Sequence, residues 1–219
     1  MKKNTKKGFT LVELMVVLLI LSGMISGVYV MLGVGRNTWA NADAQIQVQN
    51  SLRQTVERVA RELRETGSNS VGTMQVTINN GTGLNGSDVI TFSIPVICQA
   101  GQSVINATGD VSYWGAPLRW GCTDSTCMDE DDNCLTVDYE SVQYFLGADN
   151  QLLRRVLNGA GGVVDNSTTV FAQNIIDFQA ALSGDENIIT LTVTASRDTD
   201  LNRTITAVNS VHVYLRNKG

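Results

Sequence analysis

Glu13 is the first side chain whose chemistry stands out, because it is the only charged residue between Lys7 and Arg36. The stretch 14–35 carries no charge and is long enough to cross a bilayer as a helix. A carboxylate beside hydrocarbon is costly unless a partner compensates its charge. The position of Glu13 therefore indicates a function for the charge, with a partner that the neighbouring sequence does not supply.

Four cysteines form a second group of reactive side chains: Cys98, Cys122, Cys127 and Cys134. An even number within the stretch 98–134, downstream of an export-type N-terminus, predicts two disulfides in an oxidising compartment. Three pairings stay open. A zinc site with four thiolate ligands is the alternative, but no C-x-x-C pair occurs and the spacing is irregular.

An acidic stretch overlaps the cysteines. Asp129, Asp131, Asn133 and Glu140 occupy positions 1, 3, 5 and 12 of an EF-hand-like calcium loop. Position 6, which should be glycine, is a cysteine, and the flanks resemble strands rather than helices. The sequence therefore argues against an EF-hand and leaves two interpretations open, a calcium site of another kind or a solvated acidic loop. No other cofactor is expected.

No enzymatic constellation is expected in this chain. His212 is the only histidine and lies in a strand-like segment, so a multi-histidine metal site is excluded and a catalytic triad would have to be built around it. The net charge is −5, and removal of residues 1–8 with their four lysines would leave 12 basic residues against 21 acidic ones. Such an acidic product argues against binding to nucleic acid.

One long helix is predicted over residues 9–66, apolar on all sides in its first half, 9–35, and amphipathic in its second half, 36–66. In the second half apolar residues recur at spacings of three and four, the period of one helix face: Val48, Leu52, Val56, Val59 and Leu63. Glu62 lies outside this stripe, four residues after Arg58, with which it is expected to form an ion pair one turn away.

The region 67–219 is predicted to form a β-rich globular domain with a disulfide-stapled loop over 98–134. Segments rich in β-branched and aromatic residues occur at 74–78, 88–97, 135–139, 141–146, 151–157, 174–182, 187–196 and 203–215. The close spacing of these segments favours antiparallel pairing. The predicted fold class is α+β, a long N-terminal helix packed on an antiparallel sheet.

The N-terminal order of lysines, Gly8, Phe9-Thr10-Leu11-Val12-Glu13 and a long apolar run resembles the class III signal of type IV pilins and type II secretion pseudopilins. The resemblance implies the pilin fold and a leader, 1–8, that a prepilin peptidase removes by cutting between Gly8 and Phe9. It also implies N-methylation of Phe9. The new ammonium of Phe9 would then pair with Glu13 of a neighbouring subunit and set the subunit register. The alternative is that Glu13 is only favoured by the helix N-terminus.

Two further features of the apolar half bear on assembly. Gly23 and Gly27 form a small-x-x-x-small pattern that permits close helix packing, although glycine is also generally common in membrane helices. Four lysines precede the run and a lone Arg36 follows it closely, which predicts a cytoplasmic N-terminus in the inner membrane. The globular domain would be periplasmic, and the subunit would later enter a periplasmic or cell-surface filament.

The size of the globular part and the segment "VQYFLGADNQLLRR" are similar to J-type minor pseudopilins and PilW-like minor pilins. This resemblance implies a structural minor subunit in the tip or assembly-priming complex of a pilus or pseudopilus. Its expected partners are other pilin or pseudopilin subunits, the prepilin peptidase, the inner membrane and the assembly platform. The alternative function is that of a surface-displayed adhesin or DNA-uptake subunit that binds a ligand through its cysteine-rich loop.

Overall fold

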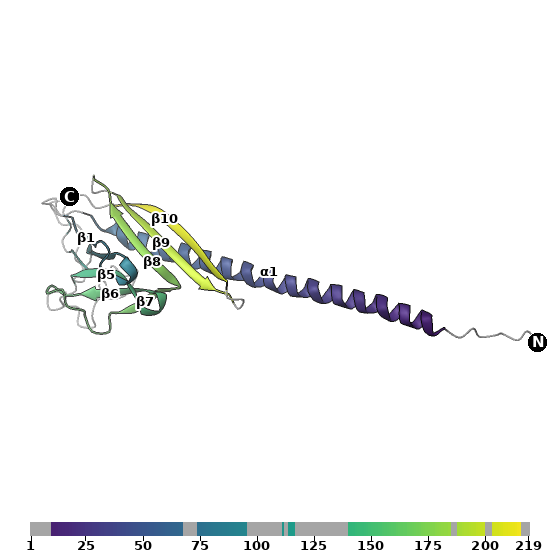
Figure 1. Ribbon diagram of the computed structural model, residues 1–219. Helices are drawn as coiled ribbons and strands as arrows, with labels where there is room; N and C mark the ends of the chain where they lie inside the picture. The colour runs from purple at the N-terminus through teal and green to yellow at the C-terminus, as the bar shows by residue number, and fades with distance from the viewer. Residues whose placement is uncertain are drawn as a thin grey trace, which may run out of the picture.

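A computed structural model describes residues 10–67, 74–95, 111, 114–116, 140–184, 188–199 and 203–215. One long helix projects from a β-rich domain, with its N-terminal half far from every strand (Figure 1). Helix α1 (Leu11–Glu65) is followed by β1 (Val76–Asn79), β2 (Val89–Phe92), β3 (Ile94–Pro95), β4 (Trp114–Gly115), β5 (Ser141–Gly147), β6 (Gln151–Leu157), β7 (Thr169–Gln173), β8 (Ile175–Leu182), β9 (Ile188–Asp198) and β10 (Thr204–Tyr214).

Helix α1 confirms the predicted single helix, and its described ends lie within two residues of the predicted ones. Its 55 residues correspond to about 80 Å at the usual rise of an α-helix. Thr10 caps the N-terminus, and at the other end the N–H of Thr66 donates to the carbonyl of Leu63. No proline interrupts this stretch, so the helix continues unbroken from the apolar half into the amphipathic half.

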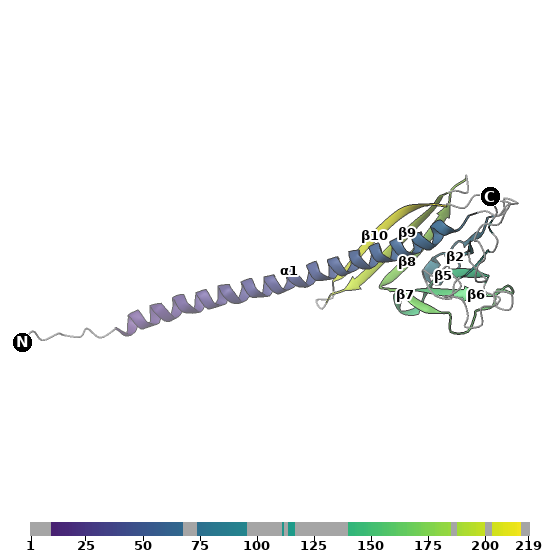
Figure 2. The same ribbon diagram turned by 180° about the vertical axis from the view of Figure 1, so that it is seen from behind.

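The amphipathic half of α1 packs against the inner face of β9 and β10 (Figure 2). The predicted apolar stripe is the buried one, since all five of its residues are at most 3% exposed: Val48, Leu52, Val56, Val59 and Leu63. In β9, alternate residues are buried, as expected for a strand with one face on the core. The helix and this sheet therefore share one hydrophobic core.

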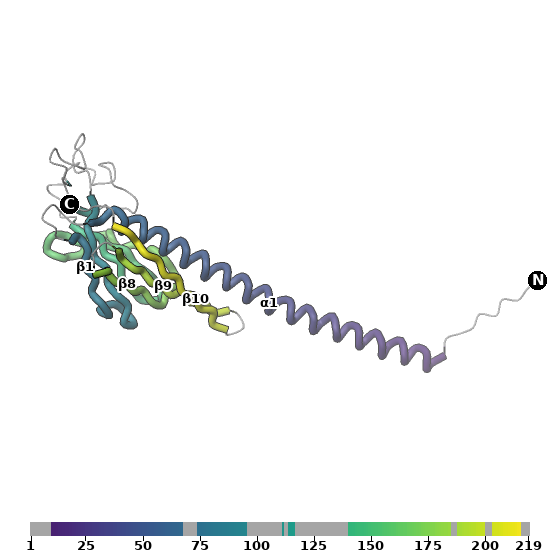
Figure 3. The backbone as a smooth tube through the Cα atoms, turned by 90° about the horizontal axis from the view of Figure 1, so that it is seen from above, coloured from purple at the N-terminus to yellow at the C-terminus, as the bar shows by residue number. Residues whose placement is uncertain are grey.

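The strands form antiparallel sheets, in agreement with the predicted α+β class. One sheet has the order β10-β9-β8, a second has the order β1-β2-β5-β6-β7, and β3 pairs with β4 in a small two-stranded ladder. Strand β8 contacts β1, β5 and β6, so the two larger sheets meet along it. Figure 3 shows β8, β9 and β10 side by side, with α1 running beside β10. This arrangement is the long-helix-and-sheet layout of a pilin-like fold.

The sequence analysis predicted β6 at its observed bounds but did not predict β7. Strands β7 and β8 follow one another along the chain, yet they belong to different sheets. Asn174 lies between them with a φ of 63° in the left-handed region, where asparagine is tolerated better than most residues. This single residue redirects the chain from one sheet to the next, and the predicted strand 174–182 begins within one residue of β8.

Candidate functional site

The apolar half of α1 is exposed along its whole length. Large apolar side chains from Leu11 to Val34 are between 49% and 79% exposed, and none of the most apolar stretch is buried by the rest of the chain. Among the described residues this is the one helix long and apolar enough to cross a membrane. Such an extended apolar surface is typical of a segment covered by lipid or by other helices.

Glu13 and Thr10 form a capping box at the start of this exposed half. The backbone N–H and the hydroxyl of Thr10 both donate to Oε2 of Glu13, over 3.0 and 3.1 Å. The N–H of Glu13 in turn donates to Oγ1 of Thr10 over 3.3 Å. Two N–H groups that the helix leaves unpaired are thereby satisfied.

The capping box gives Glu13 a partner within its own chain, in addition to the partner predicted on a neighbouring subunit. The Thr-x-x-Glu spacing before an apolar run is the signal that could have shown it. A carboxylate offers about four acceptor positions, so the cap leaves capacity for a second partner such as an ammonium group. The local cap and the predicted pairing between subunits are therefore chemically compatible.

Gly23 and Gly27 lie four residues apart on the exposed half of α1. A Cβ built at either position would meet nothing within 4 Å. The packing of this chain on itself therefore gives no reason for glycine at these positions. Close packing against another helix stays the prediction for both.

Several predicted site residues lie outside the described residues: Gly8, Phe9, Cys98, Cys122, Cys127, Cys134, Asp129, Asp131 and Asn133. Glu140 is described and exposed just before β5, and its N–H donates to the carbonyl of Leu157 over 2.9 Å. Within the described ranges no group of three or more His, Cys, Asp or Glu side chains is placed to hold a metal ion. His212 is exposed on β10, with Nδ1 2.9 Å from Oγ1 of Thr190.

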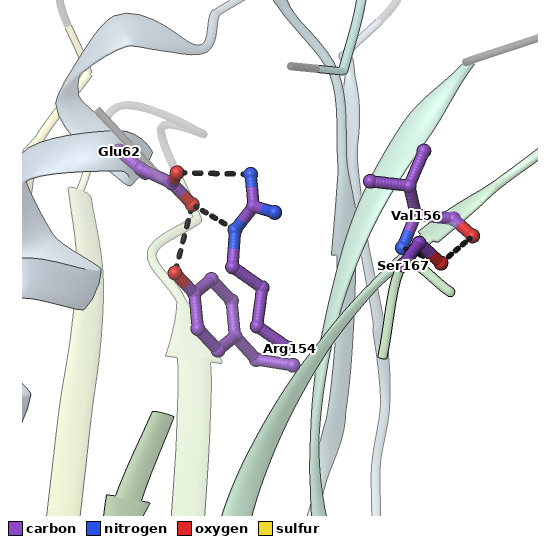
Figure 4. A network of polar contacts seen from close by, with 5 residues as sticks. Glu62, Arg154, Val156 and Ser167 are labelled. Atoms are coloured by element: carbon purple, nitrogen blue, oxygen red, sulfur yellow. Dashed lines mark hydrogen bonds and ion pairs between the residues drawn. The ribbon is translucent and has the colours of Figure 1, made fainter. Parts of the chain in front are cut away.

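A buried charge network joins α1 to the five-stranded sheet, and in it Glu62 pairs with residues far from it in the sequence. Glu62 of α1 and Arg154 of β6 have side chains only 3% and 1% exposed (Figure 4). Arg154 donates from Nη2 to Oε1 over 3.1 Å and from Nε to Oε2 over 3.3 Å. The hydroxyl of Tyr144 on β5 donates to Oε2 over 2.8 Å.

This network is placed for structural anchoring. The paired N–H groups of an arginine match the two oxygens of a carboxylate, which makes the contact strong and directional. The ring of Tyr144 is held between Phe92 and Phe171, with centroids 6.0 and 4.9 Å away. Because its groups are almost fully enclosed, the network fixes α1 on the sheet rather than presenting a charge to a substrate.

We expect the stability of the protein to fall above about pH 10, with one contribution from Tyr144. Burial, together with the nearby negative charge of Glu62, raises the pKa of Tyr144 well above its usual value. A folded pKa above the unfolded one gives a contribution that is complete below the unfolded pKa and is lost as the pH rises above it. Urea unfolding of the full chain in detergent micelles across this range measures the slope.

The variant Tyr144→Phe should reduce the steepness with which the free energy of unfolding falls as the pH rises above about 10. The matched control is Tyr214→Phe on β10, because that side chain is 66% exposed and lies in no buried network. Equal alkaline slopes for the wild type and Tyr144→Phe would contradict the prediction.

Comparison with known families identifies the N-terminal segment. Residues 3–29 match the prokaryotic N-terminal methylation motif. No curated protein and no solved structure matches the chain significantly. The matched residues include Gly8, Phe9 and Glu13 and extend into the exposed apolar half of α1. The motif indicates a type IV pilin-like or pseudopilin-like subunit, a substrate of prepilin peptidase that assembles with other pilins.

Proposed function

We propose that this chain is a structural minor subunit of a type IV filament or a type II secretion pseudopilus, located in its tip or assembly-priming complex. One observation carries the proposal: the methylation motif extends into an exposed apolar half-helix, and this helix continues without a break into a half that packs on a β-domain. A lone membrane anchor would not need this rigid connection. A filament subunit does, because its helix positions the globular domain relative to the filament axis.

In the proposed assembly the prepilin peptidase cuts between Gly8 and Phe9 on the cytoplasmic side and methylates Phe9. The new terminal ammonium then pairs with Glu13 of a neighbouring subunit. Each charge alone would be costly among apolar helices, whereas the pair offsets much of that cost. Only one axial spacing brings the two groups together, so the pair sets the register. Gly23 and Gly27 are proposed to let neighbouring helices approach closely.

We propose a minor position in the filament because the β-rich region is large and because the segment "VQYFLGADNQLLRR" resembles minor subunits. The proposed setting is the inner membrane, with the globular domain periplasmic, followed by the filament. The assembly platform and other pilin subunits are the partners that this setting requires.

The test of the proposed function is a deletion of this gene, scored for filament number and for protein secretion in the same strain. The deletion is expected to reduce filament number, protein secretion or both, and complementation with the wild-type chain should restore what is lost. Wild-type filament number together with wild-type secretion in the deletion strain would overturn the proposed role as a minor subunit.

We expect substitutions at Gly8 to act through cleavage. A bulky residue, as in Gly8→Leu, should reduce processing by about tenfold or more, because a peptidase cleft that approaches the backbone closely favours glycine. Gly8→Ala should be cleaved to a larger extent. Mass spectrometry of the membrane fraction distinguishes the full chain from one beginning with N-methylated Phe9. Equal processing of both variants would contradict this prediction.

A further inference from the structure

Trp39 is a large aromatic side chain that the globular domain leaves uncovered. It lies on α1 with 79% of its surface exposed. It precedes the buried Val48 by nine residues, about two and a half helical turns, so the two side chains lie on opposite sides of the helix. The packing of the domain on α1 therefore directs Trp39 away from the rest of the chain.

The position of Trp39 along α1 coincides with the end of the apolar half. The uncharged run ends at Gly35, Arg36 follows, and Trp39 stands about one turn further on. Tryptophan and arginine at this place are typical of the level where the hydrocarbon of a bilayer meets the headgroups. We propose that in the unassembled subunit Trp39 lies in the periplasmic headgroup layer and sets the depth of the helix. This inference rests on the proposed function.

The length of the unbroken helix then fixes the depth of Glu13. Twenty-six residues separate Glu13 from Trp39, which corresponds to about 39 Å of helix, or about 37 Å at a typical tilt. The hydrocarbon layer is about 30 Å thick, and the bilayer with its headgroups about 40–45 Å. With Trp39 in one headgroup layer, Glu13 and its capping box lie in the other.

This placement changes the environment of Glu13 before assembly. In the membrane its carboxylate is at the wet cytoplasmic surface, capped by Thr10. It enters apolar surroundings only when the helix moves into a filament, where the ammonium of a neighbour is present.

The alternative is that Tyr29 lies in the headgroup layer in place of Trp39, because Tyr29 is also aromatic and 79% exposed. It is sixteen residues from Glu13, so a helix with Tyr29 in the headgroup layer would hold Glu13 only about 24 Å away, inside the hydrocarbon layer, which is about 30 Å thick. That depth would also place Met31, Leu32 and Val34 among the headgroups or in water, although each is apolar and uncovered by the chain. The apolar surface therefore favours Trp39 as the boundary.

The first experiment measures the depth of Trp39 in the full, uncleaved chain reconstituted in vesicles of phosphatidylethanolamine and phosphatidylglycerol. The difference in fluorescence between wild type and Trp39→Phe isolates this one indole. We expect a blue-shifted emission relative to water, stronger quenching by lipids brominated near the headgroup than by lipids brominated near the chain end, and weak quenching by acrylamide.

The second experiment locates the bilayer centre with one reporter at a time, Leu21→Trp or Ile25→Trp, in a chain that keeps Trp39, and the fluorescence of the wild type is subtracted. Both positions are apolar and exposed on α1. With Trp39 as the boundary the helix centre lies near residue 26, so the reporter at position 25 should be quenched most strongly by chain-end bromines. With Tyr29 as the boundary, the same spacing of about thirteen residues from boundary to centre puts the centre near residue 16, so the reporter at position 21 lies nearer to it and the order reverses.

Either of two results overturns the inference. If Trp39 fluoresces as it would in water and the reporter at position 21 is the more deeply buried one, the boundary lies at Tyr29. If neither brominated lipids nor acrylamide quench Trp39, then Trp39 lies in a contact with another protein copy. Processing at Gly8 and methylation of Phe9, measured on the same sample with added prepilin peptidase, report on the proposed function separately.

Discussion

Replacing Arg154 with alanine is expected to lower the free energy of unfolding of the globular domain by about 3–5 kcal/mol, because the carboxylate of Glu62 would stay buried without its charged partner. Domains of this kind are stable by only about 5–15 kcal/mol, so the loss would be a large part of the total. Urea unfolding of the full chain in detergent micelles, followed by circular dichroism, measures it. The α1–sheet contact should be the first to be lost, since the network joins these two elements.

Two controls show whether burial of the charge is the cause. Arg53 and Glu57 form a one-turn ion pair on the same helix, but their side chains are 77% and 62% exposed. Arg53→Ala should therefore leave the unfolding midpoint nearly unchanged. A triple variant, Arg154→Met with Glu62→Leu and Tyr144→Phe, removes the three polar members of the network that the structure describes. It should be more stable than Arg154→Ala, since the buried charge of Glu62 is removed together with its partner.

A wild-type unfolding midpoint for Arg154→Ala would contradict the anchoring role of the network. A triple variant no more stable than the single one would show instead that the packing of these side chains, and not the unpaired charge, determines the loss.

Replacing Glu13 with glutamine or alanine is expected to leave cleavage and membrane insertion intact and to reduce filament number by about tenfold or more. Neither residue can compensate the ammonium of processed Phe9 among apolar helices, where an unpaired charge is costly. Mass spectrometry of the membrane fraction reports cleavage, and electron microscopy of sheared or overproduced filaments reports assembly.

The capping box provides the control for this prediction. Glutamine is accepted at the third position of a capping box, so Glu13→Gln keeps the helix cap and loses only the charge. Thr10→Ala does the reverse, because it removes the hydroxyl and leaves the carboxylate. If assembly depends on the charge, Glu13→Gln assembles poorly and Thr10→Ala assembles well. The opposite order would show that Glu13 acts in assembly through the cap.

The sequence predicted the helix, its two halves and most of the β-segments because these features depend on residues close together in the chain. The apolar stripe from Val48 to Leu63 could be recognised from its period alone, because such a helix face is buried regardless of which sheet packs against it. The predicted segments 141–146 and 151–157 flank the turn of the β5–β6 hairpin, where Asp149 and Asn150 adopt the left-handed backbone that such residues tolerate.

The role of Glu62 could not be predicted in this way. A glutamate four residues after an arginine on a helix is usually an exposed pair, and nothing near Glu62 in the sequence indicates burial. Its partners come from β5 and β6, 82 and 92 residues further along the chain. Burial of a charge depends on such distant partners, so the pairing follows from the packing of α1 on the sheet.

By itself the sequence determined that this chain has a processing motif, an uncharged stretch of membrane length and a helix that continues beyond it, because charge, polarity and helical period are local properties. The tertiary structure decided which charges are enclosed and where the chain passes, after Gln173, from one sheet to the other. It also decided which side of α1 the domain covers, and this leaves Trp39 exposed. Each of these depends on contacts between segments far apart in the chain, and only the packed fold specifies them.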